Sequence, residues 1–215
     1  MTRTGSGPLS PDELADWYAE PADLGEGTWV RASFITSLDG RVTGPDGRSG
    51  SLNAGSEGDA AVFAHLREWA DVVVVGAGTV IEEEYTPLPG VALAVVTRGE
   101  VLPPTLAHTE PDAGGPETGE VVLVGGKGEL TAAQIRAALV ERGWRRIVVE
   151  GGPHLLDTWL REGLLDELCL TVRPVLAGGG GPLLVGRDVE LDRLAGEATH
   201  LLTWGGDVLL RTRLR

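Results

Sequence analysis

Short apolar runs alternate with amphipathic segments along most of this chain of 215 residues. Short runs rich in valine, leucine and isoleucine are typical of strands that are buried on both faces of a parallel sheet. A first strand at 29–37 is predicted by a more alternating pattern of polar and apolar residues. The buried runs predict further strands at 72–75, 91–96, 121–124, 146–150 and 165–172.

Helix start signals fall before or between these strands. Ser10 and Glu13 form one capping-box pattern, and Thr131 and Gln134 form another. Ser56 is predicted to cap a further helix, whose apolar positions recur with the helical period. The predicted helices cover about 11–18, 57–69, 132–143 and 153–161.

Buried strands separated by helices predict an α/β fold with a mainly parallel central sheet. Two alternating segments, 199–204 and 208–214, flank the turn Gly205-Gly206-Asp207. This is the pattern of a C-terminal antiparallel hairpin. We find no internal repeat and no interdomain linker, so we expect one domain.

The N-terminal residues have a different composition. Residues 1–28 are interpreted as an extension with one short helix, ahead of a domain at 29–215. Within the extension, residues 1–9 are rich in glycine and serine and are expected to be loose. Residues 44–55 and 102–119 are expected to form surface loops.

The overall charge narrows the range of partners. With 18 Lys and Arg against 32 Asp and Glu, the formal charge is −14. Such acidity disfavours nucleic acid and anionic membranes as partners and favours a small-molecule ligand. The chain shows no signal-peptide pattern and no apolar stretch approaching the roughly 18 residues of a spanning helix, so we expect a cytoplasmic protein.

The cysteines and histidines of the sequence give little support for a metal site or a disulfide. The single cysteine, Cys169, excludes an intrachain disulfide and a multi-cysteine zinc site, and its apolar neighbours predict a buried structural thiol. The four histidines lack the spacing of metal ligands, and no metal is expected. The run Glu82-Glu83-Glu84 is either a metal-binding cluster or, more commonly, a solvated charge run.

Four glycine-rich turns follow predicted strands, at 76–79, 125–128, 151–153 and 178–181. Glycine lets the backbone approach a ligand closely, and the amides at a following helix start attract phosphate. Four such turns in one α/β chain predict an extended phosphate-containing ligand such as a dinucleotide. Their spacing matches neither the Rossmann fingerprint nor a Walker loop, which disfavours an ATPase.

A family resemblance rests on five motifs that occur in a fixed order. The motifs are Ser37-Leu38-Asp39-Gly40, Gly47-Arg48-Ser49-Gly50, Leu66-Arg67, Gly76-Ala77-Gly78-Thr79-Val80 and Val149-Glu150-Gly151-Gly152. From Val30 to the C-terminus the chain resembles the reductase domain of bifunctional riboflavin-biosynthesis proteins, a pyrimidine reductase with a dihydrofolate-reductase-like fold. The resemblance implies NADPH-dependent reduction of a ribosylaminopyrimidine 5′-phosphate by a homodimer.

The resemblance also implies a cofactor site, with Glu83 standing where the family has aspartate. The implied NADPH-binding residues are Ser37, Gly76, Thr79, Glu83, Thr97, Arg98, Gly151, Gly152, Pro153, His154, Leu155 and Leu156. Residues 151–156 would cradle the phosphates, in agreement with the physical properties of a helix N-terminus. Thr97 and Arg98 would hold the 2′-phosphate; an exposed strand-end arginine is the alternative.

The implied substrate-binding residues are Ser49, Arg67 and Glu150. Glu150, assisted by Asp39, is the candidate catalytic residue that orients the substrate or supplies a proton. Arg67 would contact the substrate phosphate, with a helix-surface salt bridge as the alternative. Asp39 has a structural alternative as well, because an aspartate in such a turn commonly caps it through its side chain.

Two departures from the family concern basic residues. Ser33 stands where the family has lysine, and no arginine lies between Thr86 and Arg98, where the family has one for the substrate phosphate. The sequence therefore predicts cofactor use more firmly than a phosphorylated substrate. Two rival hypotheses remain, a pterin- or folate-type reductase and a catalytically inactive nucleotide-binding sensor.

Overall fold

The computed structural model describes residues 2–22, 24, 27–107, 118–126, 128–191 and 194–214. Its strands are β1 (Arg3–Ser6), β2 (Trp29–Thr36), β3 (Val72–Gly76), β4 (Ala92–Thr97), β5 (Val121–Gly125), β6 (Arg146–Gly151), β7 (Glu167–Val172), β8 (Glu197–Trp204) and β9 (Asp207–Arg213). Its helices are α1 (Pro11–Trp17), α2 (Ser49–Asn53), α3 (Glu57–Trp69), α4 (Ala77–Glu82), α5 (Pro104–Ala107), α6 (Ala132–Val140) and α7 (Pro153–Arg161).

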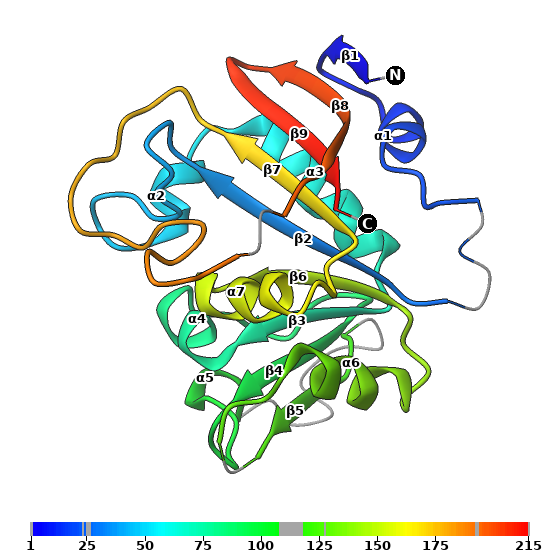
Figure 1. Ribbon diagram of the computed structural model, residues 1–215, viewed down its shortest axis with the longest axis vertical. Coiled ribbons are helices and arrows are strands. Elements are labelled where there is room, and N and C mark those ends of the chain that lie inside the picture. Colours follow the sequence, from blue (N-terminus) through cyan, green and yellow to red (C-terminus); the bar gives the residue numbers. More distant parts are fainter. Residues whose placement is uncertain are drawn as a thin grey trace.

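Across the described residues the strands form one nine-stranded sheet in the order β1-β8-β9-β7-β2-β6-β3-β4-β5 (Figure 1). β9 pairs antiparallel with β7 and β8, and the other neighbouring strands pair in parallel. The predicted single-domain α/β fold, with its mainly parallel sheet and C-terminal hairpin, is therefore confirmed.

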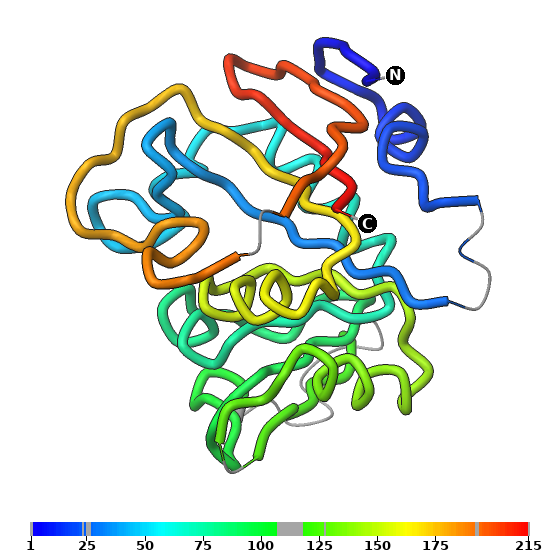
Figure 2. Tube along the Cα trace, in the orientation of Figure 1, coloured from blue at the N-terminus to red at the C-terminus, as the bar shows by residue number. Residues whose placement is uncertain are grey.

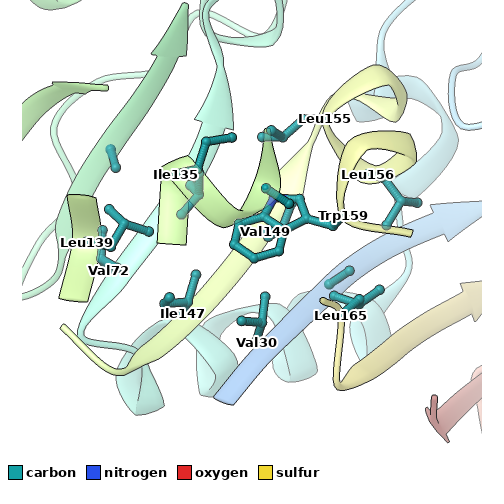
Figure 3. Close-up of a cluster of buried hydrophobic side chains, with 14 of the residues drawn as sticks. Val30, Val72, Ile135, Leu139, Ile147, Val149, Leu155, Leu156, Trp159 and Leu165 are labelled. Carbon is teal, nitrogen blue, oxygen red and sulfur yellow. The ribbon is translucent and has the colours of Figure 1, made fainter. Parts of the chain in front are cut away.

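Two apolar layers cover the two faces of the sheet. In β3, Val72 and Val74 join the layer under α6 and α7, whereas Val73 and Val75 join the layer under α1 and α3. All four valines are fully buried, as the continuous apolar run predicts. Figure 3 shows the first layer, in which Trp159 of α7 lies among residues of β6 and α6.

The expectation of a loose N-terminus is wrong for the residues of β1. This strand pairs in parallel with β8, so that the start of the chain lies beside its last hairpin (Figure 2). The glycines of this segment permit close packing: a methyl group built on Gly5 would lie 2.8 Å from the Trp17 ring, and one on Gly7 would lie 2.6 Å from the Trp204 ring. A composition that resembles a flexible tail therefore serves a close approach to two tryptophans.

A buried ionic cluster holds the end of α1 against the sheet. Glu167 on β7 accepts hydrogen bonds from Arg31 on β2 and from Arg211 on β9. Arg211 also donates to the backbone oxygens of Trp17 and Ala19. The Arg211 guanidinium thus provides hydrogen-bond donors for two backbone oxygens at the end of α1, in a region closed to water.

Local structure differs from the sequence prediction at several points. The capping boxes at Ser10 and Thr131 are present, but the hydroxyl of Ser56 donates to Asp207 and does not cap α3. The predicted loop at 44–55 contains α2, and α4 begins directly after the turn at Gly76. The start of the predicted 102–119 loop forms α5, while its residues 108–117 lie outside the described ones, as does Lys127 of the second glycine turn.

Candidate active site

A cavity of about 490 Å³ opens at the sheet edge where β2 and β6 end. Parallel strands place their carboxyl ends at one edge, which is where α/β sheets bind ligands. Side chains from β2, α2, α3 and α4, together with the end of β6, form its walls. Eight of the candidate residues line it: Ser49, Arg67, Thr79, Glu83, Glu150, Gly151, Gly152 and Pro153.

Glu150, near the end of β6, is the centre of the polar contacts in this cavity. Arg67 on α3 donates from Nε to one carboxylate oxygen and from Nη2 to the other, each at 2.7 Å. The hydroxyl of Tyr85 donates to the second oxygen at 3.0 Å. Arg67 thus forms a salt bridge, as in the alternative given for it, but its partner is a buried carboxylate on the sheet and not a residue of the helix surface.

Burial and hydrogen bonding act on Glu150 in opposite directions. Burial disfavours the charged form and raises the pKa of Glu150 above its ordinary value, while the donors on Arg67 and Tyr85 lower it in part. The net result is a raised pKa at a carboxyl whose orientation is fixed by three donors. Such a group is suited to hold and release a proton.

Tyr85 is a residue of the site that the sequence analysis missed. It follows the three consecutive glutamates that begin with the last residue of α4, and burial raises its pKa well above 10. Phe63 on α3 is another, with its ring 4.2 Å from the Arg67 guanidinium carbon. The signal available in the sequence was a lone aromatic residue within an acidic stretch.

Asp59 on α3 also lines the cavity without having been predicted. Burial raises the pKa of this carboxyl, and the nearby Asp207 raises it further. Its position one turn of helix before Phe63 places it on the face of α3 that looks toward the cavity.

Two glycine turns meet beside Glu150. A methyl group built on Gly152 would lie 2.6 Å from Oγ1 of Thr79, and one on Gly76 would lie 3.7 Å from the Gly152 nitrogen. A side chain on Gly152 would therefore collide with Thr79, whereas a methyl group on Gly76 would be in ordinary contact, so the approach of the start of α7 to α4 depends on Gly152. A methyl group on Gly78 would meet nothing within 4 Å, so the start of α4 faces open space.

The candidate cofactor residues at the start of α7 lie in different surroundings. Leu155 and Leu156 lie in the first turn of α7 with their side chains in the core, and their amides donate to the Gly152 oxygen. Because Pro153 has no N–H, His154 provides the first amide of α7. Its side chain lines a second cavity beside the fourth glycine turn.

The candidates for the 2′-phosphate lie further along the same edge of the sheet. Thr97 ends β4 and pairs with Gly125 at the end of β5, so the second glycine turn begins beside it. The Arg98 side chain is 78% exposed, and its Nη1 lies 3.9 Å from Glu129. The structure thus places both residues outside the main cavity.

The Ser37–Gly40 turn is a structural element. Ser37 donates to Asp39 at 2.7 Å, and Asp39 accepts the amides of Ala177 and Gly178 at 2.9 Å each. These hydrogen bonds, with that of Ser37 the largest, lower the pKa of Asp39 to about 2. The structure favours turn capping over a catalytic role for Asp39, because the carboxylate anchors the 177–178 loop and does not line the cavity.

Within the described part of the chain, we find no cluster of His, Cys, Asp and Glu that could hold a metal ion. In the same residues, no helix is long and apolar enough to cross a membrane.

The sheet order and the site at its edge define a dihydrofolate-reductase-like fold. A dihydrofolate reductase from Enterococcus faecalis, complexed with NADP(H), matches 87% of this chain and 97% of its own chain with a TM-score of 0.52 and 15% identity. A pyrimidine reductase-like protein from Corynebacterium diphtheriae matches 96% of this chain and 99% of its own with a TM-score of 0.75 and 23% identity.

The sequence comparison identifies the family. Residues 28–210 match the model of the RibD C-terminal domain, and the chain belongs to this family. The riboflavin biosynthesis protein RibD of Mycobacterium tuberculosis is 26% identical over 204 residues, which are 90% of this chain and 54% of that protein. The chain thus spans about half the length of the curated relatives it matches. The resemblance seen in the sequence motifs is confirmed.

Proposed function

We propose that this protein is an NADPH-dependent reductase that acts on a C=N or C=O bond of a pyrimidine-type heterocycle. Membership in a reductase family supports the class of reaction. The observation that carries the proposal is the position of Glu150: a buried carboxyl with a raised pKa directly precedes the paired glycine turns. The proposed proton donor and the proposed dinucleotide cradle would thereby be adjacent.

The residues at the sheet edge fit a dinucleotide. The starts of α4 and α7 meet through Gly76 and Gly152, and the space above Gly78 is open. Helix starts attract phosphate through their amides and their dipoles. Thr97 and Arg98, at the end of the neighbouring strand, would face the 2′-phosphate that distinguishes NADPH from NADH. Bound NADPH would supply the hydride.

The chain's own residues would orient the heterocycle and provide the proton. A carboxyl group has about four hydrogen-bonding positions, and three donors from Arg67 and Tyr85 leave one position free on Glu150. The rings of Phe63 and Tyr85 wall the cavity beside it and reduce contact with water. In protonated Glu150 this free position would carry the O–H, which would donate to an acceptor atom of the substrate and deliver the proton that accompanies the hydride.

Nicotinamide oxidation in the presence of an amino-substituted pyrimidine nucleoside or its phosphate tests this function. Glu150→Gln preserves the shape of the side chain and removes its acid–base chemistry, so turnover is expected to fall by about 10²–10⁴-fold. NADPH binding, measured by calorimetry, is expected to stay unchanged. Full turnover by Glu150→Gln would show that the proton comes from elsewhere.

We also propose that the protein is a homodimer that pairs through the β7–β9 face of the sheet. A row of three half-buried leucines crosses the neighbouring strands β7, β9 and β8. Leu210 on β9 is paired with Leu170 on β7 and with Leu201 on β8. Their strand neighbours Cys169, Leu209 and Leu202 point to the opposite face and are buried beneath α1 and α3. The row of leucines thus faces away from those helices; Leu170 packs partly against the layer under α6 and α7, and the exposed part of the row would offer an apolar surface for a second copy.

A further inference from the structure

The main cavity has a second polar end, at Asp59. Asp59 and Arg67 both lie on α3 and line the cavity, and Arg67 holds Glu150 through two hydrogen bonds. The two α3 residues are eight positions apart, which corresponds to about 12 Å along a helix that rises roughly 1.5 Å per residue. A ligand that contacts both Glu150 and Asp59 must therefore be longer than a single six-membered ring.

Ser33 lies between these two ends, on the sheet beneath α3. The strands β6, β2 and β7 are neighbours in the sheet. Glu150 on β6 and Ser33 on β2 follow one another across the parallel register of these two strands. Thr171 on β7, whose hydroxyl donates to Asp59, is paired with Ile35, two residues after Ser33. The polar groups of the cavity therefore come in the order Glu150, Ser33 and Asp59.

The side chains of Ser33 and Asp59 both have hydrogen-bonding positions left for a ligand. Ser33 lines the cavity, is only 8% exposed, and its hydroxyl has no hydrogen-bond partner among the described residues. Burial raises the pKa of Asp59, and the hydrogen bond from Thr171 lowers it in part. The nearby Arg173 is paired with Asp207 at 2.9 Å. A carboxyl group has about four hydrogen-bonding positions, so one donor leaves Asp59 largely unsatisfied.

The stretch of α3 between the two polar ends is aromatic. Phe63 lies one helical turn from Asp59 and one from Arg67, on the same face of α3, and it also lines the cavity. On the opposite wall the short side chain of Ser33 stands where the family has lysine, so it occupies less of the cavity and adds no cation. A planar ring beside Phe63 with a polar substituent that extends toward Asp59 fits this arrangement.

We propose that Ser33 and Asp59 form a subsite that binds successive hydroxyl groups of a sugar-like substituent on the heterocycle. The proposal rests on the proposed reductase function and assigns to part of its substrate two residues that lie outside the five family motifs. A hydroxyl donates to a carboxylate and accepts from a protonated carboxyl, so it matches Asp59 in either form. A heterocycle without this substituent would leave two buried polar groups unpaired, which is a means of discrimination.

Calorimetry with a matched pair of ligands tests the proposal. The probes are an aminopyrimidine and its ribonucleoside, each titrated into the NADP⁺-loaded protein. We expect the ribonucleoside to bind at least about ten-fold more tightly, because it makes two or more additional hydrogen bonds. In Asp59→Ala this ratio should fall toward one, while the affinity for the aminopyrimidine stays within about two-fold because Glu150 is unaltered.

Two further variants separate the subsite from a general effect on the fold. Ser33→Ala removes one hydroxyl from the sheet and should lower the ratio in part, which keeps the proposal testable if Asp59→Ala does not fold. Glu68→Ala removes an exposed carboxylate of α3 outside the cavity and should leave the ratio unchanged. A purely structural role of Asp59 would weaken both probes equally and leave the ratio as it is in the wild-type protein.

Equal affinity of the wild-type protein for the two probes would overturn the proposal and leave the reductase function intact. A ratio that persists in both Asp59→Ala and Ser33→Ala would overturn it as well, as would failure of both probes to bind while NADP⁺ binds. The proposed function fails separately. If the ribonucleoside shows the expected ratio but NADPH is not oxidised in its presence, the subsite stands and the proposed reduction of this substrate class is refuted.

Discussion

Arg67 on α3 and Glu150 on β6 are 83 positions apart in the sequence, yet two parallel hydrogen bonds of 2.7 Å join their side chains. The carboxylate is fully buried, and the guanidinium is 26% exposed. The arginine therefore compensates a charge that has no access to water. Its removal affects both the stability of the fold and the chemistry of the site.

Arg67→Ala is expected to lower the free energy of unfolding by about 3 kcal/mol, the low end for breaking a buried pair, because the arginine is partly exposed. Denaturant titration measures this change. The variant should also lose turnover, since Glu150 loses both its orientation and its cation. Arg67→Lys keeps the positive charge but cannot form the two parallel hydrogen bonds. Its stability and turnover should therefore lie between those of the wild-type protein and those of Arg67→Ala. An unaltered stability in Arg67→Ala would contradict the role given to this pair.

Tyr85→Phe is expected to move the pH profile of turnover to higher pH. The Tyr85 hydroxyl stabilises the Glu150 carboxylate and lowers its pKa, so its loss raises that pKa further. If Glu150 acts as the acid, activity falls as the pH rises through its pKa, and this falling limb shifts upward. The ring is retained, so packing is preserved. A shift to lower pH, or none, would exclude Tyr85 as a positioning residue.

Arg98→Ala should weaken NADPH binding by about 1–3 kcal/mol and leave NADH binding nearly unchanged, as expected for one charge-assisted contact to the 2′-phosphate. Calorimetry with both cofactors measures the difference. Arg98 is exposed and has only a loose contact with Glu129, so the substitution should not disturb the fold. Equal losses for the two cofactors would refute this assignment.

His200 is expected to make stability depend on pH. Burial, with Arg211 as the next cause, lowers the pKa of His200 from 6.5 to about 4. The unfolded chain therefore binds a proton on His200 between these values and the folded chain does not, so the free energy of unfolding falls as the pH is lowered through this window. His200→Phe keeps an aromatic ring between Trp17 and Tyr18 and should flatten this dependence. His154→Gln, at an exposed histidine of α7, is the control and should retain it.

Leu210→Asp should convert the proposed homodimer to a monomer. Leu210 is the central member of the leucine row across β7, β9 and β8, and a carboxylate there would be buried without a partner in a dimer. Light scattering at micromolar concentration measures the mass. Val101→Asp adds the same charge at a residue that is 76% exposed elsewhere, and should leave the mass unchanged. A monomeric wild-type protein would contradict the proposal.

Local patterns in the sequence were sufficient for much of the fold. The capping boxes at Ser10 and Thr131 involve residues three positions apart, so the chain itself brings the partners together. The four valines of β3 predicted a strand buried on both faces, because no polar face is present. The hairpin at Gly205 followed from a glycine pair between two alternating segments.

Only the tertiary structure decided which distant residues meet. Ser56 has the position and chemistry of a helix cap. Its hydroxyl nevertheless donates a hydrogen bond to Asp207, which lies 151 positions later in the chain. Gly5 in β1 and Gly7 just after it resembled a loose tail, because the tryptophans that they pack against belong to other elements. Glu150 and Arg67 were candidates from the motifs, but their pairing and the contribution of Tyr85 depend on the parallel order of the sheet. The sequence by itself determined the family, the strongly periodic helices and the buried strands, since those depend on short-range periodicity and motif order, whereas β1 and the short helices α2, α4 and α5 were not predicted. The charge balance of the cavity was decided by long-range packing, which sets the partner of each buried charge.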